Sequence, residues 1–132
     1  VEFFDPTSAC DGGEVIDSDR VISDTTVGRP NDFESTCGYY ARSPDRPYLL
    51  RLGAESDVTA EITDGDFDTV LHIRSVCDDA DTQIACDDDG GELGLSKLDL
   101  ASLAAGDYIL IVDGYGTWSS GDYTLDVQIT IP

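Results

Sequence analysis

The end of the chain shows the clearest alternation of apolar and polar side chains. From Asp122 to Ile131 every second residue is apolar, beginning with Tyr123 and Leu125, and the residues between them are polar. This period of two places the apolar side chains on one face of a β-strand. The preceding run, Tyr108–Val112, is apolar on both faces and rich in β-branched residues. Such a run is typical of a central strand that is covered on both sides.

Shorter runs of the same kind come before these two strands at regular intervals. Turn-forming pairs such as Asp64–Gly65 and Gly90–Gly91 separate them. Short strands spaced in this way, about eight in all, predict an all-β fold built as an antiparallel β-sandwich or barrel. The expected strands before residue 106 are Arg20–Thr26, Tyr48–Leu52, Val58–Thr63, Thr69–Arg74, Gln83–Cys86 and Lys97–Leu100.

The segments between these strands are predicted to be irregular. We expect residues 1–13 to form an extended N-terminal arm and residues 28–46 a long connection, rich in Pro, Asn, Asp and Ser. Leu100–Ala105 is the segment that fits a helical turn. Long loops are usually functional or stapled to the domain, and Cys37 offers such a staple. A chain of 132 residues has the size of one domain, so we expect residues 1–132 to fold as a single unit.

Acidic side chains strongly outnumber basic ones. The sequence contains 28 Asp and Glu against 7 Lys and Arg, which gives a formal net charge of −21. This charge repels phosphate groups and anionic lipids, so we expect no nucleic-acid partner. It suits multivalent cations, basic partners or a salty environment, and simple solubility explains it equally well. No apolar run approaches the roughly 20 residues of a membrane span, so we expect no membrane insertion.

The cysteines predict two disulfides. Their number is even, and none lies in a CxxC pair or near a histidine cluster. The favoured pairing joins Cys77 to Cys86, closing a short loop between two strands, and Cys10 to Cys37, although the other two pairings remain formally possible. Because disulfides persist in oxidising surroundings, this content predicts a secreted, extracellular protein.

Four segments of the second half carry a family resemblance. They read DFDTVLHIRSVC at residues 66–77, IACDDDGG at 84–91, SKLDLASLAAGDYILIVDGYG at 96–116 and SGDYTL at 120–125. In this order and at this spacing they resemble the bacterial pre-peptidase C-terminal domain. The resemblance implies a compact, jelly-roll-like β-sandwich appended to secreted proteins, most often hydrolases. It also implies a non-catalytic role in secretion or targeting, with calcium and matrix binding in related collagenase modules.

Clustered acidic residues make calcium the first candidate ligand. Calcium takes about six to eight oxygen ligands, which Asp-rich loops supply. Asp64, Asp66 and Asp68 form one such cluster. Resemblance to calcium-binding relatives adds an Asn-Asp pair, so the predicted metal ligands are Asn31, Asp32, Asp87, Asp88 and Asp89. The alternative is that these aspartates cap backbone amides in tight turns.

An aromatic loop is the second candidate site. Residues 114–121 read GYGTWSSG, so Tyr115 and Trp118 are flanked by small residues. Exposed aromatic rings offer a stacking face for a sugar or an anchor for a protein partner. The alternative is that Trp118 folds back over the end of the core. Tyr39 and Tyr40 are a weaker aromatic candidate, with packing around the Cys37 disulfide as their alternative role.

Catalysis is not predicted. The one histidine, His72, lies inside the apolar strand TVLHIR, where a structural role is expected. No GxSxG nucleophile motif is present, and a Ser-His-Asp triad would have to use a histidine from the middle of a strand.

These observations predict a non-catalytic extracellular binding or targeting module. Calcium would stabilise its loops, and Tyr115 and Trp118 would contact a glycan or protein ligand. The alternative is a structural subunit that assembles with copies of itself into filaments or adhesive structures outside the cell. The apolar arm Val1–Phe4 and the alternating last strand are features that strand donation uses.

Overall fold

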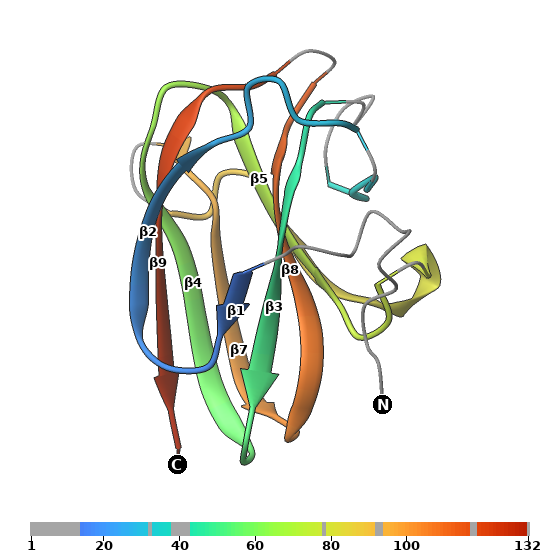
Figure 1. Cartoon of the computed structure of the whole chain (residues 1–132), viewed down its shortest axis with the longest axis vertical. Coiled ribbons are helices and arrows are strands. Elements are labelled where there is room, and N and C mark those ends of the chain that lie inside the picture. Colours follow the sequence, from blue (N-terminus) through green and yellow to red (C-terminus); the bar gives the residue numbers. More distant parts are fainter. Residues whose placement is uncertain are drawn as a thin grey trace.

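The chain folds into two facing β-sheets (Figure 1). The computed structural model describes residues 14–31, 33–37, 43–77, 79–91, 94–116 and 119–131. In spatial order, sheet A consists of β1 (Glu14–Ile16), β3 (Arg46–Leu52), β8 (Gly106–Gly114), β5 (Thr69–Arg74) and β6 (Gln83–Asp87). Sheet B consists of β2 (Arg20–Thr25), β9 (Asp122–Thr130), β4 (Ser56–Gly65) and β7 (Lys97–Leu103). The predicted all-β, disulfide-stapled sandwich is confirmed.

The pairing is antiparallel throughout the described strands, except between β1 and β3. All eight predicted strands are present, with ends that differ by a few residues. Strand β1 was not predicted, because its three residues are too few to show a period. It aligns parallel to β3, with Glu14 opposite Tyr48 and Ile16 opposite Leu50.

The predicted helical turn at Leu100–Ala105 is wrong. Residues 100–103 continue β7, and Leu100 lies opposite Val58 of β4. The register then shifts, and Ser102 adopts a positive φ of 53°. This irregularity weakened the period-two pattern that would otherwise have indicated a strand. A short 3-10 helix, η1 (Ala80–Thr82), forms instead between β5 and β6.

The main hydrophobic core lies between the two sheets. Alternate residues of β9 point into it, so that Tyr123, Leu125 and Val127 are buried as the sequence pattern predicts. The facing strand β8 contributes Tyr108, Leu110 and Val112. These inner faces hold the sandwich together because each removes apolar surface from water.

A second hydrophobic cluster covers the outer face of sheet A. It contains Phe33, Leu49, Cys77, Ile109 and Ile111, all buried. Because β8 lies in the middle of sheet A, one of its faces meets the main core and the other meets this cluster. This arrangement confirms that the doubly apolar run is a central strand covered on both sides.

The favoured cysteine pairing is wrong, because Cys37 bonds to Cys86. The last residue pair of the β5–β6 hairpin is Arg74 with Gln83, so Cys77 lies beyond the paired strands. Cys77 is buried in the second cluster and is also disulfide-bonded, whereas Cys10 lies outside the described residues. The prediction that Cys37 staples the long connection is confirmed, with Cys86 as its partner.

The last strand is paired on both sides within its own sheet. Strand β9 lies between β2 and β4 and pairs with both along most of its length. Its alternating pattern therefore reflects a central position in sheet B, and its use in strand donation stays a prediction. The arm Val1–Phe4 lies outside the described residues. Within the described ranges, no helix has the length and apolar character needed to cross a membrane.

Candidate ligand-binding site

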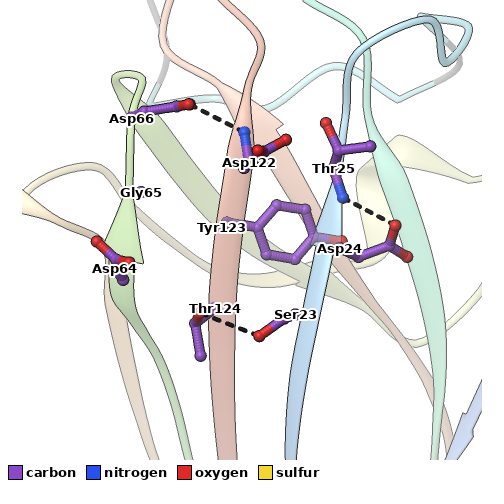
Figure 2. A pocket seen from close by; sticks show the side chains of 9 residues that line it. All are labelled: Ser23, Asp24, Thr25, Asp64, Gly65, Asp66, Asp122, Tyr123 and Thr124. Carbon is purple, nitrogen blue, oxygen red and sulfur yellow. Dashed lines mark hydrogen bonds between the residues drawn. The ribbon is translucent and has the colours of Figure 1, made fainter.

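A polar hollow of about 560 Å³ opens at the end of sheet B where β2 and β4 finish and β9 begins (Figure 2). It is lined by hydroxyls and carboxylates from these three neighbouring strands and by one tyrosine. The lining residues are Ser23, Asp24, Thr25, Asp64, Gly65, Asp66, Asp122, Tyr123 and Thr124. The hollow is thus a product of strand order, since residues 23–25, 64–66 and 122–124 are far apart in the sequence.

Hydrogen bonds within the lining hold its side chains in place. Ser23 and Thr124 are opposite each other in the register, and their hydroxyl oxygens are 3.2 Å apart. The Asp122 N–H donates a hydrogen bond of 2.9 Å to Oδ1 of Asp66. Both contacts are visible in Figure 2. The hollow therefore presents an array of acceptors that is organised before any ligand arrives.

Gly121 fixes the loop that precedes β9. A Cβ at this position would clash with Oδ1 of Asp66 and with the ring of Phe67. The Gly121 N–H donates to Oγ1 of Thr26 over 3.1 Å, and its carbonyl accepts from the Thr26 N–H at 3.0 Å. The glycine of the SGDYTL segment is therefore required for the close approach that forms one wall of the hollow.

Asp24 has its charge balanced inside the protein. Its carboxylate lies 3.3 Å from Arg46 and 3.5 Å from Arg29. Burial raises the pKa of Asp24, but the hydrogen bond from Thr25 and the two arginines outweigh burial and lower it overall. This acid belongs to an ion-pair network that links β2 to β3.

The other three acids of the hollow are differently placed. Among the described residues, no cationic side chain forms an ion pair with Asp64, Asp66 or Asp122, and all three are exposed. Carboxylates and hydroxyls at such a rim accept hydrogen bonds from hydroxyl or ammonium groups of a ligand. The site has the chemistry to bind a donor-rich ligand.

A tyrosine pair forms a rigid base beneath the hollow. The hydroxyl oxygens of Tyr48 on β3 and Tyr123 on β9 are 2.5 Å apart, and both residues are buried. Burial raises the pKa of each tyrosine. The Arg46 guanidinium lies over the Tyr48 ring at 4.7 Å from its centroid. The two sheets are thus joined by a polar contact directly below the candidate site.

The predicted aromatic site is described only in part. Tyr115 is half-buried, and its backbone N–H donates to the Asp68 carbonyl over 2.8 Å. Its loop joins β8 to β9 at the same end of the sandwich as the hollow, because Asp122 both ends the connection and lines the hollow. Trp118, Tyr39 and Tyr40 lie outside the described residues.

The predicted calcium ligands do not gather into one site among the described residues. Within these ranges, no group of three or more His, Cys, Asp or Glu side chains is arranged to hold a metal. Oδ2 of Asp87 accepts hydrogen bonds from the Gly90 and Lys97 N–H groups, each with a length of 2.8 Å. Asp87 therefore caps backbone amides in a turn, as the alternative interpretation predicted. Asn31 is exposed, and Asp32 lies outside the described residues.

The structure does bring together two acidic clusters that are separate in the sequence. The carboxyl of Asp88 lies within hydrogen-bonding reach of that of Asp68, and Asp89 is also near. Burial, followed by the charges of Asp68 and Asp89, raises the pKa of Asp88 to about 6. Oδ1 of Asp88 is buried and has no hydrogen-bond partner in the described part of the chain. This pair of acids attracts a proton or a cation.

Comparison with known proteins identifies the fold. The sequence matches no protein-family model and no curated protein. The structure is similar to that of the pre-peptidase C-terminal domain of collagenase from Bacillus anthracis, with a TM-score of 0.58 and 12% sequence identity. The match covers 88% of this chain and 94% of that domain. The chain has the fold of a pre-peptidase C-terminal domain.

In this pre-peptidase C-terminal fold, the segments that carried the sequence resemblance have definable places. Residues 106–114 are the central strand of sheet A, and residues 120–125 lead into β9 and the hollow.

Ser23 and Thr124 were not predicted as site residues, since isolated hydroxyl residues in strands are common. A signal was present for Thr124 alone, which lies on a polar position of a strand whose alternate residues are apolar; Ser23 lies opposite it in the register.

Proposed function

We propose that this chain is a non-catalytic binding or targeting module of a secreted protein. The observation that carries the proposal is the preorganised hollow at the loop end of sheet B, beside the loop that contains Tyr115. The fold that it shares with a collagenase pre-peptidase C-terminal domain supports a role as an accessory module, and the disulfides support an oxidising, extracellular location. His72 is completely buried, which agrees with the structural role expected of it.

The ligand that suits this site is a glycan or protein segment rich in hydroxyl or ammonium groups. Asp64, Asp66 and Asp122 would accept hydrogen bonds from these donors, and the Ser23 and Thr124 hydroxyls would orient them. Tyr115, and Trp118 in the same loop, would add an aromatic stacking face. Affinity would come from a few such groups on a rigid sandwich, with little loss of conformational freedom.

Binding is testable with defined probes. We expect the protein to bind at least one of three probes: chitosan oligomers, cellohexaose or a lysine-rich peptide. The double variant Asp122→Asn/Thr124→Ala should weaken that binding about tenfold or more, because it removes one charged and one neutral hydrogen bond from the hollow. The measurement is titration calorimetry at fixed ionic strength.

The control for this experiment is Asp81→Asn, which removes one negative charge in η1, outside the lining of the hollow. An equal loss of affinity in the control would mean that net charge alone attracts the ligand. The proposal would be contradicted if the wild-type protein bound none of the three probes.

We further propose that calcium stabilises the loops through Asp68 and Asp88. The buried, unpartnered Oδ1 of Asp88 and its contact with the Asp68 carboxyl support this proposal. Calcium prefers carboxylate and carbonyl oxygens, and these two acids would supply part of such a set, with waters completing it. Of the predicted ligands, Asp88 keeps this role in the proposal, with Asp68 as its partner; Asp87 caps backbone amides, and Asp32 lies outside the described residues.

Calcium is expected to raise the thermal unfolding midpoint above the value in chelator. The increase should be larger at pH 7.5 than at pH 5, because the Asp88 carboxyl, with its pKa of about 6, must be ionised to bind the metal. Asp88→Asn should abolish the increase, whereas Asp81→Asn should leave it unchanged. Equal midpoints of the wild-type protein in calcium and in chelator would exclude the proposal.

A further inference from the structure

A second hollow, of about 350 Å³, opens at the end of the sandwich opposite the candidate ligand-binding site. The first hollow lies where β9 begins and β4 finishes. The second lies where β9 ends and β4 begins, which is the end marked C in Figure 1. Its walls come from the β3–β4 turn, the end of β9 and the β1–β2 connection. The proposed ligand-binding site does not use this hollow.

An apolar surface leads from the main core into this second hollow. Leu52 is 4% exposed and belongs to the core, and Ile129 is partly buried against it. Ile131 also lines the hollow and is 69% exposed, more than any other large hydrophobic residue in the described ranges. The base of the core is therefore open to water, and an apolar group that covered it would remove this surface from water.

The hollow arises because the chain changes sheets beside it. Strand β1 pairs with β3 only as far as Leu50, and β2 pairs with β9 only as far as Val127. Between β1 and β2 the chain crosses from sheet A to sheet B, so the last residues of β3 and β9 have no strand neighbour on this side in the described part of the chain. A side chain replaces the missing strand at one point: the Ile129 N–H donates a hydrogen bond of 2.8 Å to Oδ1 of Asp19.

The cysteines indicate an anchor for the N-terminal arm. Cys77 is disulfide-bonded, and Cys37 and Cys86 are bonded to each other. The count of cysteines in the sequence leaves Cys10 as the partner of Cys77 within this chain. Cys77 lies in the hydrophobic cluster on the outer face of sheet A. A Cys10–Cys77 bond would therefore anchor the arm at that face.

The apolar residues of the arm can reach the hollow from this anchor. Phe4 precedes Cys10 by six positions, which an extended chain spans with about 20 Å. Leu49 belongs to the same outer cluster as Cys77, and Arg51, two residues further along β3, lines the hollow. Alternate residues of a strand share a face and are about 7 Å apart, so the rim of the hollow lies on the anchored face.

We propose that the arm Val1–Phe4 docks in the second hollow of its own chain. The Phe3 and Phe4 rings pack on Ile129 and Ile131 and extend the main core to its base. Each aromatic ring has about 150–250 Å² of surface to bury, which suits an open apolar floor of this kind. The arm is the longest apolar run of the sequence that lies outside the two described clusters.

The arm of the same chain is favoured over the arm of a second copy for two reasons. A segment held by a short tether has an effective concentration in the millimolar range, which a separate molecule rarely reaches. Two copies of a chain with a net charge of −21 also repel each other. The arm is thereby kept within its own domain, and strand donation to a neighbouring molecule would require it to leave the hollow.

Nuclear Overhauser effects in isotope-labelled wild-type protein test this inference. We expect contacts between the ring protons of Phe3 or Phe4 and the methyl groups of Ile129 and Ile131, and these contacts should persist on dilution. In a mixture of labelled and unlabelled chains, the same contacts should be absent between chains. Peptide mapping without reduction should recover Cys10 joined to Cys77.

A pair of variants provides the matched control. Phe3→Ala/Phe4→Ala should shift the methyl resonances of Ile129 and Ile131, because the aromatic ring currents are lost. It should leave the methyl resonances of Ile84, which is 45% exposed on β6, unchanged. Val27→Ala, at a 59% exposed position beyond the other end of β2, should shift none of these resonances.

Three results would overturn the proposal. The first is the absence of contacts between the Phe3 and Phe4 rings and the hollow. The second is a set of contacts found only between differently labelled chains, which would mean that a second copy fills the hollow and that the chain assembles by exchange of its arm. The third is a bond from Cys10 to a cysteine other than Cys77.

Discussion

Replacing Cys37 and Cys86 together by alanine is expected to lower the free energy of unfolding by about 4 kcal/mol. The two cysteines are 49 residues apart in the sequence, so their bond restricts a long loop of the unfolded chain. It also ties the connection over the outer face of sheet A to β6, an edge strand. Urea unfolding followed by circular dichroism measures the change.

The matched control for the disulfide is Ile84→Ala, in the same strand as Cys86. Ile84 is 45% exposed, and its truncation should change stability by less than about 1 kcal/mol. A loss below about 1 kcal/mol in the double cysteine variant would show that the outer covering of sheet A contributes little to the folded state.

Leu110→Ala is expected to cost about 3 kcal/mol. Leu110 is 1% exposed and belongs to β8, the central strand of sheet A, with its side chain in the core between the sheets. Truncation removes buried methyl groups and leaves a cavity that the paired strands on either side prevent from closing. The loss should appear in the urea midpoint with an unchanged slope.

Val21→Ala provides the comparison for this core substitution. Val21 is also an aliphatic residue of a β-strand, but it is 64% exposed at the edge of sheet B. We expect its replacement to change stability by less than about 0.5 kcal/mol. Similar costs for Leu110→Ala and Val21→Ala would contradict the two-layer core described above.

The two-sheet fold was predictable because burial imposes a period on the sequence. Strand β9 buries one face, and its alternation of Tyr123, Leu125 and Val127 with polar residues indicated this directly. Strand β8 buries both faces, and its continuous apolar run indicated a central position. Strand β1 was not predictable, since three residues contain too little of a pattern and its partner β3 lies thirty residues further along the chain.

The site was less predictable, because its parts come from separate strands. The acidic loops were predicted, but the neighbouring residues Asp87 and Asp88 have different roles. Asp87 caps backbone amides, whereas the carboxyl of Asp88 lies beside that of Asp68. The hollow of sheet B draws on β2, β4 and β9, and only the strand order brings them together. Local patterns contain no information on which strand ends are neighbours.

The sequence by itself determined the class of fold, the central strands and the presence of disulfides. Each of these depends on local periodicity or on the number of cysteines. The tertiary structure decided that Cys37 bonds to Cys86, that Asp68 lies beside Asp88, and that His72 contacts Asp113. These contacts join residues that are between 20 and 49 positions apart, and they arise because hydrogen bonding between strands and burial of their apolar faces select one register and one strand order.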